Sequence, residues 1–124
     1  MKKNRPVNLD LSTISLPVTG YVSILHRMSG VIMLAGVLGL MWFLDASLRS
    51  AEGFASVHKC LSSPGAKLIT WGILSALAYH LVAGIRHMFM DMGIGETLEG
   101  GRSGAKLVLA IAGVLIVGLG VWLW

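Results

Sequence analysis

The sequence predicts an all-α integral membrane protein: a bundle of three transmembrane helices preceded by a short polar N-terminal arm. Of the 124 residues, 55% are hydrophobic and only 13% are charged, whereas roughly a quarter of the residues in a soluble domain are charged. Residues 28–44, 68–85 and 107–124 contain no Asp, Glu, Lys or Arg. Each run is close to the length of about 20 apolar residues that crosses the hydrocarbon core of a bilayer.

We expect a single membrane-anchor domain that covers residues 1–124. Its parts are an arm over residues 1–20 and helices at about 21–48, 65–91 and 103–124. Pro64 suits the first turn of the second helix, where its missing N–H costs no hydrogen bond. A cluster of glycines at positions 93, 95, 100 and 101 is expected to break the connection to the third helix. We expect no sizeable extramembrane domain in these 124 residues, so that any soluble chemistry would belong to partner subunits.

The distribution of Lys and Arg predicts that the N-terminus lies inside and the C-terminus outside, because positive residues collect on the cytoplasmic face. The inner set is Lys2, Lys3, Arg5, Arg27, Arg86, Arg102 and Lys106, and the outer set is Arg49, Lys59 and Lys67. All four tryptophans fall at the outer helix ends, as in an interfacial aromatic belt. Since the positive charge sits at helix ends, nucleic acid is not an expected partner.

His80 is an ionisable residue inside an uncharged run, where such a residue normally faces the protein interior and has a partner. With Gly84, His87 and Asp91 it follows a spacing of four, three and four, which places all of them on one helix face. A neutral imidazole beside small residues suits the axial position of an iron porphyrin. The alternative is a packing histidine that hydrogen-bonds across the bundle.

A second axial ligand is not expected from the same helix. His80 and His87 are about 10 Å apart along one face, so they cannot bind one iron from opposite sides. His26 is the other candidate within the membrane, but a ligand from a second subunit is the simpler arrangement. His87 and Asp91 either form an interfacial anchor with local ion pairs, or serve as a propionate partner and a proton or docking group.

The first helix carries a second polar group. Ser23, Arg27 and Gly30 share a face, with His26 at its margin. Such side chains can hydrogen-bond a quinone carbonyl and stabilise charge during its reduction, or neutralise haem propionates. Alternatively, Arg27 extends to the lipid headgroups as an ordinary interfacial cation.

Three segments carry a family resemblance. They are Arg5-Pro6-Val7-Asn8-Leu9, then Ser23-Ile24-Leu25-His26-Arg27-Met28-Ser29-Gly30, and finally residues 80–91, which begin His80-Leu81-Val82-Ala83-Gly84. Together they resemble the cytochrome b subunit of succinate dehydrogenase over essentially the whole chain. The third helix and both loops have no comparable motif.

The resemblance implies one of two membrane anchors in a four-subunit succinate:quinone oxidoreductase. The partners would be a flavoprotein subunit, an iron–sulfur subunit and a second three-helix anchor. One haem b would be shared with that second anchor, and His80 would be its axial iron ligand on this chain. His26, Arg27, His87 and Gly84 would also border the haem.

The same resemblance implies that Ser23 and Arg27 bind ubiquinone, which takes electrons from succinate by way of the partner subunits. The chain would be no enzyme alone, and it would lie in the bacterial cytoplasmic membrane with a periplasmic C-terminus. Two other functions are weighed against this one. One is a small proton-coupled transporter or channel subunit that uses His80, His87 and Asp91; the other is a haem-free structural anchor.

Overall fold

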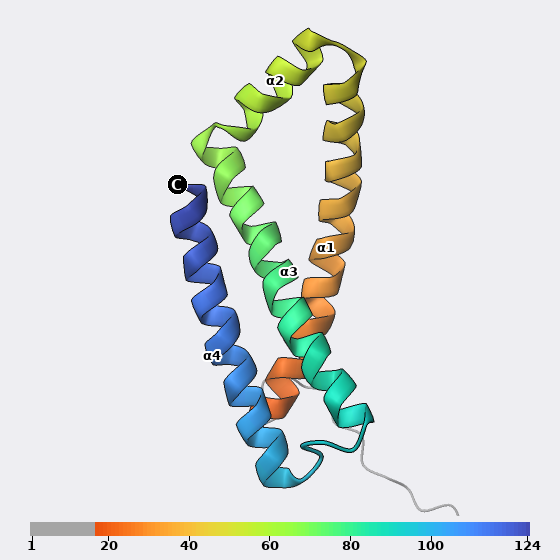
Figure 1. The fold of residues 1–124 in the computed structure, drawn as a ribbon, viewed down its shortest axis with the longest axis vertical. Coiled ribbons are helices and arrows are strands. Elements are labelled where there is room, and N and C mark those ends of the chain that lie inside the picture. The colour runs from red at the N-terminus through yellow and green to blue at the C-terminus, as the bar shows by residue number, and fades with distance from the viewer. Residues whose placement is uncertain (1–16) are drawn as a thin grey trace, which may run out of the picture.

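The computed structural model describes residues 17–124, and the part described is almost entirely helical (Figure 1). The helices are α1 (Val18–Arg49), α2 (Ala51–Leu61), α3 (Pro64–Asp91) and α4 (Leu98–Leu123). Three of them, α1, α3 and α4, are long and apolar enough to cross a membrane. The predicted all-helical, three-span membrane fold is therefore confirmed. Most of the predicted arm lies outside the described residues.

Helix α2 was not expected from the sequence. It follows α1 almost directly and leads back toward the start of α3 (Figure 1). Local chemistry explains it: the Ser50 side chain accepts a hydrogen bond from the Gly53 N–H, and Glu52 lies in the first turn. A hydroxyl cap and an acidic first turn both favour a helix N-terminus. The cap was visible in the sequence, but α2 lacks the long apolar run that marks the spans.

The beginnings of α3 and α4 follow from capping residues. Ser63 accepts from the Ala66 N–H with Pro64 in the first turn, as predicted. Thr97 accepts from the Gly100 N–H, so α4 begins at Leu98, ahead of the predicted start at residue 103. Gly100 and Gly101 consequently lie inside α4 and not in the connection.

The connection between α3 and α4 turns at two glycines. Gly93 and Gly95 have φ angles of 85° and 75°, a region that residues with a Cβ seldom adopt. These two glycines break the helix as the sequence predicted.

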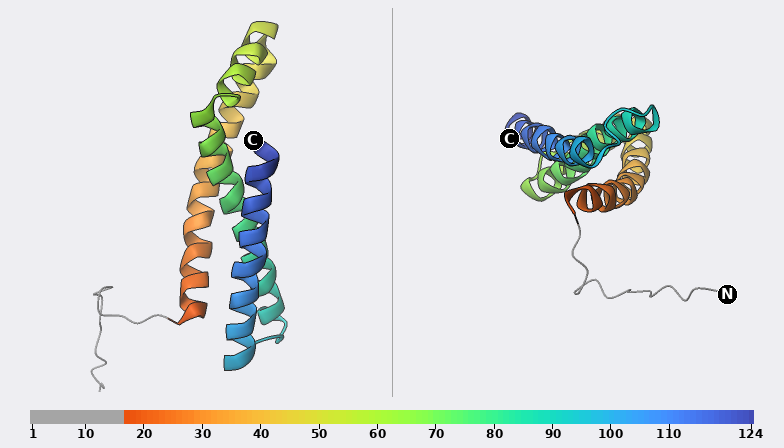
Figure 2. Two further views of the ribbon diagram at one scale, coloured as in Figure 1. Left: turned by 90° about the vertical axis from the view of Figure 1, so that its left-hand side faces the viewer. Right: turned by 90° about the horizontal axis from the view of Figure 1, so that it is seen from below.

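The packing is closest toward the end of the bundle that holds this connection. There α1 and α3 cross, whereas they diverge toward α2, and α4 runs alongside α3 (Figures 1 and 2). The buried core is made mostly of small residues from all three spans. Its members are Val22, Tyr79, Ala83, Ala105, Val108 and Ala112. Small side chains let helix backbones approach closely, which is the usual basis of helix association in lipid.

Polar side chains of α3 connect it to both neighbouring spans. The Tyr79 hydroxyl donates to the Val22 carbonyl of α1 at 2.7 Å. Toward α4, the Trp71 indole N–H donates to the Ile116 carbonyl at 2.8 Å, and Arg86 donates to the Gly101 carbonyl at 3.1 Å. Each bond satisfies a polar group that would otherwise be costly in hydrocarbon.

Glycines on α4 make room for two of these side chains. A Cβ at Gly120 would lie 3.1 Å from Trp71 Nε1, and one at Gly104 would lie 3.2 Å from Arg86 Nε. The described spans are thus held together by close backbone approach and a few directed hydrogen bonds.

Candidate functional site

A cluster of three histidines lies where α1 crosses α3. The rings of His26 and His80 are stacked, with centroids 4.0 Å apart and an interplanar angle of 12°. The His87 ring is tilted at 56° to that of His26, with centroids 5.1 Å apart. His26 therefore belongs to the same cluster as the two histidines of α3, whereas the sequence placed it only at the margin of its helix face.

The Nδ1 atom of His80 is held by two groups of α1. It lies 3.0 Å from the Ser29 hydroxyl oxygen and 3.1 Å from the His26 carbonyl oxygen. A carbonyl oxygen can only accept, so the hydrogen bond to it requires the proton to be on Nδ1. In the neutral form of a ring that donates from Nδ1, the lone pair lies on Nε2. An imidazole that donates through one nitrogen to a carbonyl and keeps the other for a metal has the arrangement typical of histidine ligands.

Ser29 is the residue of this site that sequence reasoning missed. It is only 5% exposed, and its hydroxyl also donates to the His26 carbonyl at 2.8 Å. Its position three residues after His26 and directly before Gly30 was a signal that could have been used. A serine in an apolar helix commonly hydrogen-bonds to the backbone of its own helix. Such a serine gives no reason to expect a contact with another helix, so the contact with α3 was not predicted.

Two glycines shape the space around the stacked rings. A Cβ at Gly30 would lie 3.3 Å from His80 Cε1, and one at Gly84 would lie 3.6 Å from His26 Nε2. Gly30 thus lets the His80 ring lie directly against α1. Gly84 lies opposite the Nε2 edge of the His26 ring, where a Cβ would make only an ordinary van der Waals contact.

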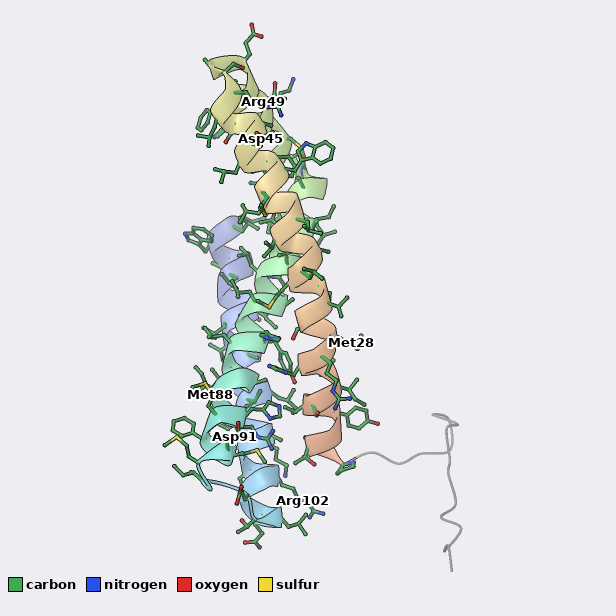
Figure 3. All side chains as sticks on the ribbon, turned by 90° about the vertical axis from the view of Figure 1, so that its right-hand side faces the viewer. Met28, Asp45, Arg49, Met88, Asp91 and Arg102 are labelled. Carbon is green, nitrogen blue, oxygen red and sulfur yellow. The ribbon has the colours of Figure 1, made fainter. Side chains whose placement is uncertain are left out.

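The remaining predicted residues lie at the same end of the bundle. Ser23 is half-buried on α1, one helical turn before His26, and Arg27 is exposed. Asp91 is the exposed last residue of α3, and Figure 3 shows it at the same end as Arg102, far from Asp45 and Arg49. A cation and a hydroxyl are therefore available on the α1 surface beside the histidines.

The donor set suits an iron held by a porphyrin better than a bare metal ion. Within residues 17–124, no three His, Cys, Asp or Glu side chains are grouped so that they could hold an ion. A porphyrin supplies the equatorial ligands itself and needs from the protein only an axial group such as one imidazole. The Nε2 atom of His80, which the Nδ1 hydrogen bonds leave available, and the exposed Arg27 cation one residue after His26 fit such a group.

The fold and this site define a multi-pass membrane anchor with a half-buried histidine cluster. Residues 1–119 match the family of succinate dehydrogenase/fumarate reductase transmembrane subunits. The chain is 40% identical over 125 residues, all of both chains, to the succinate dehydrogenase cytochrome b556 subunit of Coxiella burnetii. It is 34% identical over 114 residues to that of Paracoccus denitrificans, covering 92% of this chain and 88% of the relative.

The Rickettsia felis subunit of the same name is 34% identical over 95 residues, with coverage of 77% and 73%. The chain belongs to this family, and its function is that of a membrane-anchor cytochrome b subunit of a succinate dehydrogenase complex. The family predicted from the sequence motifs is confirmed.

The close approach of Gly30 to His80 yields a stability prediction. Gly30→Val should displace the His80 ring and destabilise the protein by about 1–3 kcal/mol, the usual cost of overpacking. Gly39→Val is the matched control on the same helix, since a Cβ at Gly39 meets no atom within 4 Å. The measurement is the melting temperature of the purified complex by size-exclusion retention after heating. Equal melting temperatures for the two variants would contradict the contact.

Proposed function

We propose that this chain binds one haem b jointly with a second membrane anchor, with His80 Nε2 as one axial ligand of the iron. The observation that carries the proposal is the hydrogen bonding of His80 Nδ1 to the Ser29 hydroxyl and the His26 carbonyl. Because these bonds occupy Nδ1, Nε2 is the ring nitrogen that remains available to a metal. When bound, the haem supplies a centre that can accept and return single electrons.

A second ligand of the haem iron would come from the partner anchor and not from His26. The His26 ring is stacked face to face on the His80 ring, so the two imidazoles do not face each other across a space that could hold the group. The role of His26, together with His87 and Arg27, is to bind the haem propionates by hydrogen bonding and charge. Gly84 lets the flat macrocycle approach the α3 backbone.

Ser23 and Arg27 form this chain's part of a ubiquinone site. The Ser23 hydroxyl donates a hydrogen bond to a quinone carbonyl, and the Arg27 guanidinium stabilises the negative charge that develops there as the quinone is reduced. The exposure of Arg27 supports this role, because its guanidinium is accessible to a ligand or partner at the protein surface. Electrons reach the quinone from succinate through a flavoprotein subunit and an iron–sulfur subunit. Asp91 assists proton uptake or subunit docking at the same end.

The protein lies in the bacterial cytoplasmic membrane with its N-terminus in the cytoplasm and its C-terminus in the periplasm. This orientation puts the histidine cluster, Ser23 and Arg27 in the cytoplasmic half, where the soluble subunits dock. A proton-transporting function is less well supported. The outer stretches, residues 30–44, 68–78 and 107–124, contain no Asp, Glu, Lys, Arg or His that could continue a relay.

The haem assignment predicts a spectroscopic difference between two histidine variants. The succinate dehydrogenase complex should show a low-spin b-type band in its dithionite-reduced minus oxidised spectrum. His80→Ala should lose or shift that band, whereas His58→Ala, at an exposed position on α2, should keep it. An unchanged band in His80→Ala would refute the ligand assignment. A wild-type complex without haem would instead support the haem-free anchor.

The quinone assignment predicts a selective loss of quinone reduction. Ser23→Ala should lower succinate:ubiquinone activity by about 10-fold, the value of one hydrogen bond of roughly 1.4 kcal/mol. Arg27→Leu should lower it further, because a charged partner is lost. Succinate oxidation by phenazine methosulfate, which bypasses the quinone, should be unaffected.

Controls for that experiment lie at the other end of the same helix. They are Ser47→Ala and Arg49→Leu, which alter exposed groups of α1. If these controls lose as much quinone activity as Ser23→Ala and Arg27→Leu, the site does not lie where we propose.

The orientation is testable through the single cysteine. Cys60 is free and exposed on α2, so a membrane-impermeant maleimide should label it in intact spheroplasts. In a Cys60→Ser/Glu99→Cys variant, labelling should require permeabilised cells, because Glu99 lies at the start of α4. The opposite pattern would reverse the proposed topology.

A further inference from the structure

A buried serine connects the candidate haem ligand to the backbone of the neighbouring helix. We propose that Ser29 is a positioning residue for His80: its hydroxyl fixes the rotation of the imidazole, whose tautomer the His26 carbonyl sets, and thereby tunes the ligand that His80 presents to the haem iron. This inference rests on the proposed function of His80 as an axial ligand. It assigns to Ser29 a role that acts through His80 and involves no contact with the haem.

The geometry is a closed triangle of three polar groups. Ser29 Oγ lies 2.8 Å from the His26 carbonyl oxygen and 3.0 Å from His80 Nδ1, and Nδ1 lies 3.1 Å from the same carbonyl. A hydroxyl has one proton and two lone pairs. It therefore donates to the carbonyl and accepts from Nδ1–H, and the single Nδ1 proton is shared between the Ser29 hydroxyl and the His26 carbonyl oxygen.

The His26 carbonyl alone would hold the ring poorly. It lies within α1, where a helical carbonyl already accepts from the backbone N–H four residues later. The third contact with α1 is steric, since Gly30 lies directly against His80 Cε1. Ser29 thus supplies the additional acceptor that ties the Nδ1–H to one direction. At 5% exposure it does so out of reach of water, which would otherwise compete for the bond.

The consequence for a bound iron follows from how imidazole ligands are tuned. The hydrogen bond made by the ring nitrogen that does not bind the metal fixes the ring orientation and raises the basicity of the nitrogen that does. Losing such a hydrogen-bond partner commonly weakens metal binding by about 10- to 100-fold. Ser29→Ala keeps the helix and the His80 side chain but removes one of the two acceptors of Nδ1–H. The imidazole ring should then rotate more freely, and its Nε2 atom should bind the iron more weakly.

The experiment uses the intact complex with three serine variants. Ser29→Ala removes the hydroxyl, and Ser29→Thr restores it. Ser47→Ala is the matched control, because the Ser47 hydroxyl donates to the Leu44 carbonyl at 2.8 Å with the same three-residue spacing but at the exposed end of α1. The readouts are the g-values of the oxidised haem by electron paramagnetic resonance, its midpoint potential, and the rate of haem loss to apomyoglobin.

We expect Ser29→Ala to shift the g-values and the midpoint potential and to lose haem about 10-fold faster or more. Ser29→Thr and Ser47→Ala should match the wild type. Complete loss of haem from Ser29→Ala, with retention in Ser29→Thr, would also support the role of the hydroxyl. Wild-type g-values and potential in Ser29→Ala would overturn the inference, as would equal changes in Ser29→Ala and Ser29→Thr.

Measuring the His80→Ala complex beside these serine variants separates this inference from the proposed function. If His80→Ala retains the wild-type haem spectrum, the ligand assignment and the role of Ser29 fail together. If His80→Ala loses the spectrum while Ser29→Ala is indistinguishable from wild type, only the positioning role fails.

Discussion

The arrangement of this protein depends on one constraint: inside a bilayer, each buried polar group must find its partner within the protein. Helix α3 meets this constraint in both directions at four of its side chains, whereas the buried Ser75 hydroxyl has no partner among the described residues. Tyr79 and His80 bond to α1, and Trp71 and Arg86 bond to α4. In water such bonds would compete with solvent, but in hydrocarbon they specify which helix faces meet. The histidine cluster exists because α1 and α3 are brought together at that crossing.

The core of the chain is small, and this bears on its function as an anchor. The buried residues are mainly alanine and valine, while large apolar side chains cover the outward faces of the spans. Those faces suit contact with lipid or with other membrane subunits. Because α1 and α3 diverge toward α2 (Figure 1), close packing is concentrated at the end that holds the histidines, Ser23 and Arg27. The helices therefore pack most closely at the same end of the bundle that holds the candidate haem and quinone residues.

Much of the fold was predictable because its signals are local. The spans follow from uncharged runs, and Pro64, Gly93 and Gly95 mark real helix boundaries. The two differences between the predicted and the observed helices also have local causes. Helix α2 and the early start of α4 depend on the hydroxyl caps of Ser50 and Thr97, which hydropathy does not register. The histidines of the candidate site could be chosen from the sequence, since His80 and His26 are ionisable groups in apolar helices, but Ser29 was not expected to contact His80.

By itself, the sequence determined the three-span membrane fold, the family and the polar residues available at one end of the helices, because apolar run length and motifs are read along one chain. Only the tertiary structure decided which of those residues meet. The stacking of His26 on His80, the bond from Ser29 to His80 Nδ1 and the contact of Gly30 with the ring all join α1 to α3. They depend on the crossing point and relative rotation of the two helices. Those are set by backbone approach and hydrogen bonding across the bundle, and no pattern within either helix encodes them.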